Sequence, residues 1–275
     1  GFKIIRGYDK WKPAVNTFNH NFQLESKVKD ILDFENINEI ESLPNTHIII
    51  GSPPCVSFSS SNRAGKSDKT LGIRLIETYL KIVAVKKHQP NSILKAWFME
   101  NVTNSKKYLR PYYTFKHLDL SEWAIENKIN PKKIAIDLRG NSQIINAADY
   151  GSFQARSRVI SGEIIKAGKL IIPPKTHSKN ISHETLPHKT LNEIKSILPS
   201  PFSNKSKAKI IDPFYFIELE LEELWDHFYD TGIFISEWKQ SKFLKTNHPY
   251  MGKMSFPENE SKPSRTITAT KISHS

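Results

Sequence analysis

The 275-residue sequence has a single cysteine, Cys55. One cysteine excludes an internal disulfide and suits a reducing compartment, so we expect a cytoplasmic protein. No apolar run approaches the ~20 residues that a membrane-spanning helix needs, and a membrane partner is therefore not expected. Zinc-ligand spacings, a Walker loop and a Gly-x-Gly-x-x-Gly motif are also absent from the sequence, so we expect no metal.

Acidic residues are fewer than basic residues. There are 40 Lys and Arg residues against 28 Asp and Glu, which gives a formal net charge of +12. Such an excess favours a polyanionic partner, and nucleic acid comes before a membrane surface because no amphipathic basic helix stands out. A generally lysine-rich proteome is the alternative. The 38% hydrophobic content excludes a disordered chain, and the length allows one large domain with or without a small one.

One short stretch joins an apolar strand to the only cysteine. Residues 48–50 are all isoleucine and end at Gly51, a pattern typical of a buried strand in a parallel sheet. Pro53 and Pro54 cannot donate to a strand ladder, so the chain leaves the sheet there as a loop. Ligands of open α/β sheets bind beyond the carboxyl ends of the strands. Cys55 is therefore a candidate nucleophile, and an inert buried thiol is the alternative.

A second strand brings an acidic residue to the same edge. Apolar residues at helical spacing predict a helix over 71–87, and residues 93–99 read as the next buried strand. Strand, helix and strand form a βαβ unit with parallel pairing, which indicates an α/β fold. Glu100 ends the second strand, so we expect it beside Cys55. A helix-capping or solvated glutamate is the alternative.

Three motifs in order resemble those of the DNA cytosine-5 methyltransferases of bacterial restriction-modification systems. Residues 54–59 resemble the family's Pro-Cys-x-x-Phe-Ser nucleophile motif, residues 98–102 its Glu-Asn-Val motif, and residues 154–158 its Gln-x-Arg-x-Arg motif. The resemblance covers roughly residues 1–165 and a short piece near the end. It implies a Rossmann-like sheet that binds S-adenosylmethionine and methylates cytosine in a specific double-stranded DNA sequence.

The resemblance also implies roles for the catalytic residues. Cys55 would add to carbon 6 of a flipped-out cytosine, while Glu100 would neutralise charge on the ring and hold the exocyclic amine. Arg158 would donate to the ring carbonyl. Arg156 and Arg158 could supply the positive charge that lowers the pKa of a thiol from its usual ~8.5.

Several acidic and apolar residues are candidates for holding the cofactor. Residues 2–9 read as a strand, and Asp9 at its end suits the ribose hydroxyls; an aspartate that starts a helix over 11–18 is the alternative. Asp30 and Ile31 resemble the family's adenine-edge pair, with a surface aspartate before a helix or turn as the alternative. By resemblance, Leu75 contacts the adenine and Pro54 completes the cofactor-binding set.

DNA contacts are expected in two places. Residues 62–70 are polar and charged, and they read as a loop after the nucleophile. In and before this loop, Ser59, Ser61 and Arg63 could hold phosphates, although a solvated loop is equally compatible with the pattern. Gln154 is the fourth candidate DNA-binding residue, by resemblance.

Changes in amino-acid composition and periodicity along the chain predict the domains. Residues 1–165 form the catalytic domain, and residues 166–260, rich in proline and serine with little periodicity, form a small irregular target-recognition domain. Residues 261–275 return to the catalytic domain. Lys205, Lys207 and Lys209 alternate and could line one strand face, toward either a polyanion or water.

The family's Gly-rich cofactor loop is not found before Asp9, and the sequence stops soon after residues 266–268. We therefore expect an interior fragment, or one part of a split enzyme whose complementary chain supplies the missing ends. Two rival functions remain open: a transfer-RNA cytosine methyltransferase of the same fold, and a non-catalytic DNA-binding relic.

Overall fold

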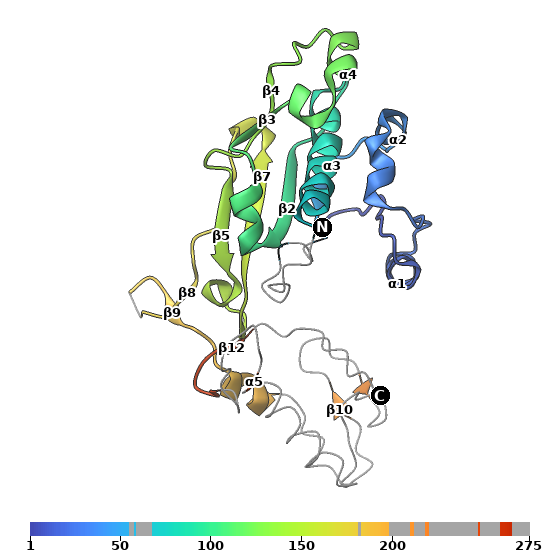
Figure 1. Cartoon of the computed structure of the whole chain (residues 1–275). Helices are drawn as coiled ribbons and strands as arrows, with labels where there is room; N and C mark the ends of the chain where they lie inside the picture. The colour runs from blue at the N-terminus through green and yellow to red at the C-terminus, as the bar shows by residue number, and fades with distance from the viewer. Residues whose placement is uncertain are drawn as a thin grey trace. The chain divides into compact units, whose positions relative to one another are not determined.

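The computed structural model describes residues 1–54, 58, 68–180, 183–197, 210–211, 218–219, 247 and 259–265. The chain forms two compact units. The first contains residues 1–145 and 158–173, and the second contains residues 146–157 and 174–275 (Figure 1). Among the described residues, no helix is both long and apolar enough to cross a bilayer.

A four-stranded sheet organises the first unit. Its strands are β1 (Ile48–Gly51), β2 (Ala96–Val102), β7 (Ser157–Ile164) and β5 (Ser142–Asn146), in the order β1-β2-β7-β5. β1 pairs in parallel with β2, so that Gly51 lies opposite Met99, and β7 is antiparallel to β2. The parallel β1–α3–β2 unit confirms the predicted α/β class.

β1 differs from its prediction in one respect. The strand forms where expected, but it is only partly buried, and Ile50 is 77% exposed. β1 is an edge strand of the sheet as described, whereas the central strand β2 buries Trp97 and Met99 almost completely. An unbroken apolar run reports hydrophobicity, and it cannot say whether both faces of the strand are covered.

Helix α3 (Lys69–His88) connects the two parallel strands and lies alongside β2 (Figure 1). Its first turn is capped by Asp68, whose carboxylate accepts a hydrogen bond from the Leu71 backbone N–H at 3.1 Å. The apolar stripe, including Ile76, Leu80 and Val83, is buried in the core with the side chains of β2. The predicted helix over 71–87 is confirmed.

Residues after β2 add further buried side chains to this core. A 3₁₀ turn, η4 (Thr103–Tyr108), leads into a hairpin of β3 (Tyr112–Thr114) and β4 (Ile134–Asp137), which pair antiparallel. The connection carries η5 (Lys116–Leu118) and α4 (Ser121–Glu126). These elements bury Tyr113, Phe115, Trp123 and Ile136.

The N-terminal segment is helical rather than extended. It contains α1 (Lys12–Phe22), η1 (Ile31–Glu35) and α2 (Ile37–Glu41). The helix predicted after Asp9 is confirmed, but the strand predicted over 2–9 is wrong. The described residues give this segment only an isolated bridge between Asp9 and Val28, and residues 2–6 are exposed. An apolar segment becomes a strand only where a partner completes its ladder.

The second unit is built from short elements. η6 (Ala147–Tyr150) precedes β6 (Gln154–Ala155), which pairs in parallel with β12 (Ser264–Arg265). β8 (His177–Ser178) pairs with β9 (Leu186–Pro187), and β10 (Ile210–Ile211) pairs with β11 (Glu218–Leu219). Helix α5 (Leu191–Ile197) also belongs to this unit, whereas η7 (Ile165–Ala167), which follows β7, belongs to the first unit.

A buried carboxylate ties parts of the second unit together. Asp149 accepts from Lys175 Nζ at 2.7 Å and lies 2.8 Å from His188 Nε2. Burial is the largest single influence on the pKa of Asp149 and raises it, but the hydrogen bonds and charges of Lys175 and His188 together outweigh burial and hold the pKa below its usual value. Whether this unit recognises a DNA target stays a prediction.

Candidate active site

The carboxyl end of β1 lies beside the last residues of β2. The strand predicted over 93–99 forms at Ala96–Val102, so Glu100 lies inside β2, opposite Ile160 of β7, and does not follow its end. Gly51 lies opposite Met99, so Ser52 and Glu100 are the next residues along the two chains. A side chain at Gly51 would collide with Tyr79, because an added Cβ would lie 2.2 Å from the ring. The Tyr79 hydroxyl donates to the Phe98 carbonyl at 2.7 Å, and burial raises the pKa of Tyr79. Helix α3 thus lies directly against this part of the sheet.

Glu100 is held from two sides. Its Oε1 atom lies 2.8 Å from Arg158 Nε, and its Oε2 atom accepts a 2.6 Å hydrogen bond from the Ser52 hydroxyl. Arg158 comes from β7, where it lies opposite Val102. The Glu100 side chain is 36% exposed and that of Arg158 is 18% exposed. The structure therefore brings these two predicted catalytic residues together, with the carboxylate open to a ligand.

Asn101 ties the loop that leads to the cysteine to β2. Its Nδ2 group donates to the Pro53 carbonyl at 3.0 Å, and its Oδ1 atom accepts from the Val102 N–H at 2.8 Å. Asn101 is 1% exposed and Pro53 is also buried, while Pro54 is exposed. The backbone preceding Cys55 is thus fastened to the strand that carries Glu100.

The candidate nucleophile is not among the described residues. Cys55, Ser59, Ser61 and Arg63 lie outside the described residues, so their predicted roles stay predictions. Phe58 is described, and it is buried with its ring centroid 5.1 Å from that of Tyr108.

Of the two candidate cofactor carboxylates, Asp30 starts a helix and Asp9 lies shortly before one. Asp9 Oδ1 accepts from the Trp11 N–H at 2.7 Å, just before α1. Asp30 is the N-cap of η1 and accepts from the Leu32 N–H at 3.0 Å. The Lys29 N–H donates to the Asp9 carbonyl at 3.0 Å, so the segments that carry Asp9 and Asp30 run side by side.

The apolar cofactor candidates lie where η1 packs on α3. Ile31 is partly buried against the core cluster, and Leu75 on α3 is 9% exposed. Arg74 makes a bidentate ion pair with Glu35, with both N–O distances 2.5 Å, and this pair ties η1 to α3. The structure thus groups Asp9, Asp30, Ile31 and Leu75 within the first unit, while their role in binding stays a prediction.

Gln154 and Arg156 belong to the second unit. Gln154 lies opposite Ser264 in the β6–β12 pair, and the Arg156 carbonyl accepts from the Ala147 N–H at 3.0 Å. Both side chains are partly buried. The prediction that Arg156 lowers the pKa of the thiol remains untested.

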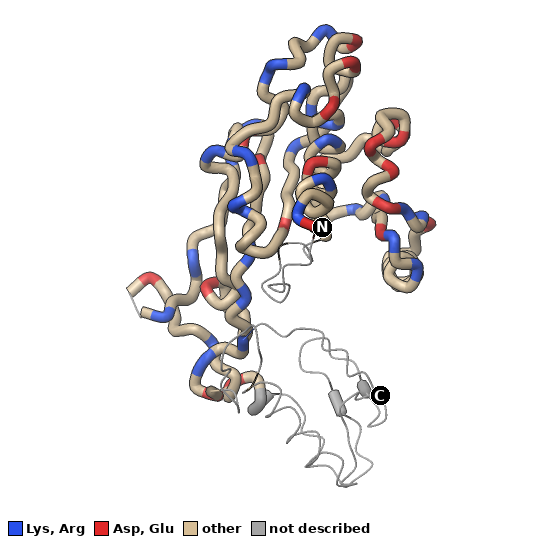
Figure 2. Tube along the Cα trace, viewed as in Figure 1, with Lys and Arg blue, Asp and Glu red and all other residues tan. Residues whose placement is uncertain are grey.

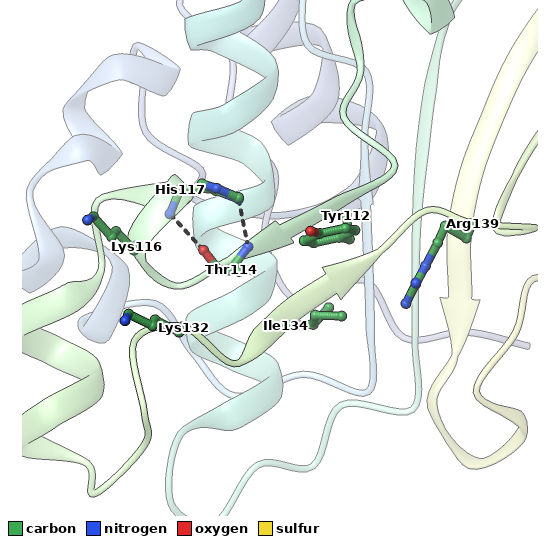
Figure 3. Close-up of a pocket in the computed structure, with 7 residues that line it drawn as sticks. All are labelled: Tyr112, Thr114, Lys116, His117, Lys132, Ile134 and Arg139. Atoms are coloured by element: carbon green, nitrogen blue, oxygen red, sulfur yellow. Dashed lines mark hydrogen bonds between the residues drawn. The ribbon is translucent and has the colours of Figure 1, made fainter.

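A hollow of about 490 Å³ lies on the β3–β4 hairpin (Figure 3). Its lining residues are Tyr112, Thr114, Lys116, His117, Lys132, Ile134 and Arg139. No predicted site residue lines it. The candidate site is therefore the strand edge around Glu100 and not this hollow.

Sequence reasoning missed Ser52. The residue belongs to no periodic pattern, and it was passed over as part of the loop between Gly51 and the prolines. Its position one residue beyond the end of β1 was the available signal, because residues there face the same edge as the end of β2.

The chain is similar in sequence to known methyltransferases. The chain is 40% identical over 111 residues to Type II methyltransferase M.HgiDI of Herpetosiphon aurantiacus, a match that covers 38% of this chain and 32% of that protein. It is 38% identical over 113 residues to Type II methyltransferase M.HgiGI of the same organism, a match that covers 38% of this chain and 78% of that protein. A solved structure of the Entamoeba histolytica methyltransferase EhMeth gives a TM-score of 0.39 at 19% identity, covering 74% of this chain and 53% of that one.

The match to M.HgiDI therefore spans about a third of that relative's length. Residues 1–272 match the family described as C-5 cytosine-specific DNA methylase. This match confirms the resemblance inferred from the three motifs. The chain belongs to the C-5 cytosine-specific DNA methylase family.

Proposed function

We propose that the protein methylates carbon 5 of cytosine in a specific double-stranded DNA sequence, with S-adenosylmethionine as methyl donor. It would act as the modification enzyme of a restriction system in the prokaryotic cytoplasm. The observation that carries the proposal is the Glu100–Arg158 pair at the strand edge where β1 leads into Pro54 and Cys55. Membership of the DNA methylase family supports it.

The proposed reaction begins at Cys55. Carbon 5 of cytosine is a poor nucleophile, and addition of the Cys55 thiolate to carbon 6 makes it electron-rich. A thiolate is the strongest nucleophile among the side chains near neutral pH. S-adenosylmethionine supplies a methyl group on a positively charged sulfur, which carbon 5 attacks. Loss of the proton from carbon 5 and departure of the thiolate then restore the ring.

Glu100 and Arg158 would stabilise the charge that addition creates. When the thiolate adds, electrons move toward ring nitrogen 3 and the ring carbonyl. Glu100, carrying a proton, would donate it to nitrogen 3 and accept from the exocyclic amine, while Arg158 would donate to the carbonyl. The exposed Glu100 carboxylate and the nearby guanidinium suit this division of labour. A ring with a carbonyl in place of the amine would lack the donor that Glu100 needs.

The residues present fit the adenosine part of the cofactor. Ribose hydroxyls and the adenine amine are donors, and Asp9 and Asp30 offer carboxylates from adjacent exposed segments. Ile31 and Leu75 offer apolar contact beside them, and Pro54 is exposed at the end of β1. We propose these five residues as the cofactor contacts.

DNA binding would involve both units. Carbon 5 and carbon 6 are inaccessible to a thiol inside a duplex, so the target base must be flipped out, at a cost of a few kcal/mol. The net charge of +12 favours phosphate contacts that offset this cost. We assign Ser59, Ser61, Arg63 and Gln154 to such contacts, and residues 166–260 to target recognition.

Transfer of a labelled methyl group tests the proposal. The protein is expected to label duplex DNA and not transfer RNA, and Cys55→Ser is expected to abolish labelling while DNA affinity changes by less than about tenfold. A duplex with 5-fluorocytosine at the target should trap a covalent complex with the wild type only, because fluorine cannot leave carbon 5 as the proton does. Full activity in Cys55→Ser would refute the mechanism, and labelling of transfer RNA alone would refute the substrate.

A further inference from the structure

We propose that Ser52 is a positioning residue for Glu100, and that its hydroxyl sets the carboxylate in the plane needed to read the cytosine edge. The inference rests on the proposed function. It starts from one contact: the Ser52 hydroxyl donates to Glu100 Oε2 at 2.6 Å. This distance is at the short end of the range for O–H···O hydrogen bonds.

Each carboxylate oxygen of Glu100 has one of the two contacts. Ser52 occupies one lone pair on Oε2, and Arg158 occupies one on Oε1. A carboxylate offers about four acceptor positions, so one remains on each oxygen. A cytosine presents ring nitrogen 3, an acceptor, beside its exocyclic amine, a donor. Glu100 can meet both at once if the free position on one oxygen carries the proton that is donated to nitrogen 3 and the free position on the other accepts from the amine.

A contact from Arg158 alone would leave the orientation of the Glu100 carboxylate less well defined. The last torsion of a glutamate is broad, so a group held at one oxygen can rotate about it. The second contact, from Ser52, removes that freedom. Such loss of freedom before the substrate arrives lowers the barrier to a reaction that depends on orientation.

The backbone around Ser52 is itself fixed. Gly51 is held in the parallel ladder opposite Met99, and the Pro53 carbonyl accepts from buried Asn101. Ser52 therefore lies between two anchored residues, and its hydroxyl starts from a defined position. Ser52 is the first residue after β1 and lies just beyond the paired register of β1 and β2.

The size of the effect is limited by solvent. The Ser52 side chain is exposed, so water can replace part of the lost contact in a variant. A hydrogen bond to a charged group contributes ~1.5–3 kcal/mol when buried, and we expect the lower end here, which is about tenfold in rate.

Steady-state methyl transfer by Ser52→Ala, Ser52→Thr and Ser42→Ala tests the inference. Ser42 is an exposed serine that donates to the Glu39 carbonyl and serves as the matched control. In Ser52→Ala we expect kcat to fall about tenfold while KM for DNA stays within about twofold. Ser52→Thr keeps the hydroxyl and should stay within about threefold of the wild type. Ser42→Ala should equal the wild type.

A double-mutant cycle with Glu100→Gln separates positioning from a structural role. If Ser52 acts through Glu100, Ser52→Ala should change the residual rate of Glu100→Gln by less than about twofold. An equal loss in both backgrounds, or a wild-type rate in Ser52→Ala, would overturn the inference while leaving the proposed function intact. A wild type without methyl transfer would overturn both. Denaturation midpoints, with Ser52→Gly as a second variant, check that the fold is retained.

Discussion

Glu100 combines an exposed carboxylate with two fixed donors. The Arg158 guanidinium at 2.8 Å and the Ser52 hydroxyl at 2.6 Å come from different strand ends, and each contacts a different oxygen. A glutamate with only a structural role would have no need of an open face. The arrangement instead resembles a site in which a further partner, here the cytosine edge, completes the hydrogen bonding.

Replacement of Glu100 by glutamine tests this chemistry. The amide keeps the size and the acceptor oxygen, but it cannot deliver a proton to ring nitrogen 3. We expect Glu100→Gln to lower kcat by about 10²-fold or more and to leave the thermal midpoint nearly unchanged. The matched control is Glu122→Gln, an exposed glutamate on α4, which should equal the wild type. Wild-type turnover in Glu100→Gln would reduce Glu100 to a structural residue.

Motifs and local chemistry predicted different parts of the site. Glu100 and Arg158 were each predicted as site residues from their motifs, while their ion pair is added by the structure. Asp9 and Asp30 were expected to contact the cofactor or to start a helix or turn; the structure shows Asp30 as the N-cap of η1, whereas Asp9 lies before Trp11, the N-cap of α1. The position of Ser52 just beyond β1 could be predicted from sequence, but its partner could not, because the contact depends on the β1–β2 register, which places residues 48 positions apart side by side.

At the scale of elements, what was predictable depended on whether the stabilising partner was local. Helix α3 carries its own cap and its own apolar stripe, so its limits were predicted within a few residues. β1 and β2 were recognised by short apolar runs around that helix. Residues 2–9 also contain apolar side chains, but a strand there needed a distant ladder partner that sequence periodicity does not report.

One ion pair joins three elements of the first unit. Lys87 on α3 lies 2.7 Å from Glu163 on β7, and the indole N–H of Trp97 on β2 donates to the same oxygen at 3.3 Å. The two charged side chains are 18% and 10% exposed. Glu163→Ala would leave a largely buried ammonium without its partner, and we expect it to destabilise the fold by about 3 kcal/mol.

Urea denaturation of matched variants measures this effect. The double variant Lys87→Met with Glu163→Leu removes both charges and fills the space, so it should be clearly more stable than Glu163→Ala. Equal stability of Glu163→Ala and the wild type would mean that solvent reaches Lys87 and that the pair does not join α3 to the sheet.

The end of α3 also predicts a dependence of stability on pH. Burial lowers the pKa of His88 below its usual 6.5, although its hydrogen bond to the Ala135 carbonyl, at 3.1 Å, acts in the opposite direction. Below pH 6.5 the unfolded chain therefore binds a proton that the folded chain resists. The stability that the fold gains by keeping His88 neutral is fully present above pH 6.5. It is lost as the pH falls toward the lower pKa that His88 has in the folded state.

Unfolding free energies between pH 7.5 and pH 5, about 1 unit above and about 1.5 units below the usual histidine pKa, can isolate this residue. The wild type should lose stability toward pH 5, and His88→Gln, which keeps a donor for Ala135, should lose less over the same range. His20→Gln, at an exposed position on α1, is the control and should follow the wild type. Parallel curves for the wild type and His88→Gln would contradict the assignment.

For the whole molecule, net charge is the dominant property. Lys and Arg occur in both units, with Asp and Glu interspersed (Figure 2). The charge of +12 predicts DNA binding that weakens steeply with salt, because each neutralised phosphate releases counterions. Lys205, Lys207 and Lys209 lie in the segment proposed to recognise the target. Changing all three to serine should reduce the slope of log K against log salt concentration by about 2 to 3 if each contacts a phosphate.

The control for this prediction removes the same charge elsewhere. Lys116, Lys132 and Lys133 are exposed on or beside the β3–β4 hairpin, in the first unit, and the first two line the hollow in Figure 3. Their triple serine variant has the same net charge as the variant at 205–209, so a general electrostatic attraction would weaken equally in both. A smaller slope only in the 205–209 variant would indicate direct phosphate contacts there. Equal slopes in the two variants would mean that net charge alone drives binding, and the assignment of residues 166–260 to target recognition would lose this support.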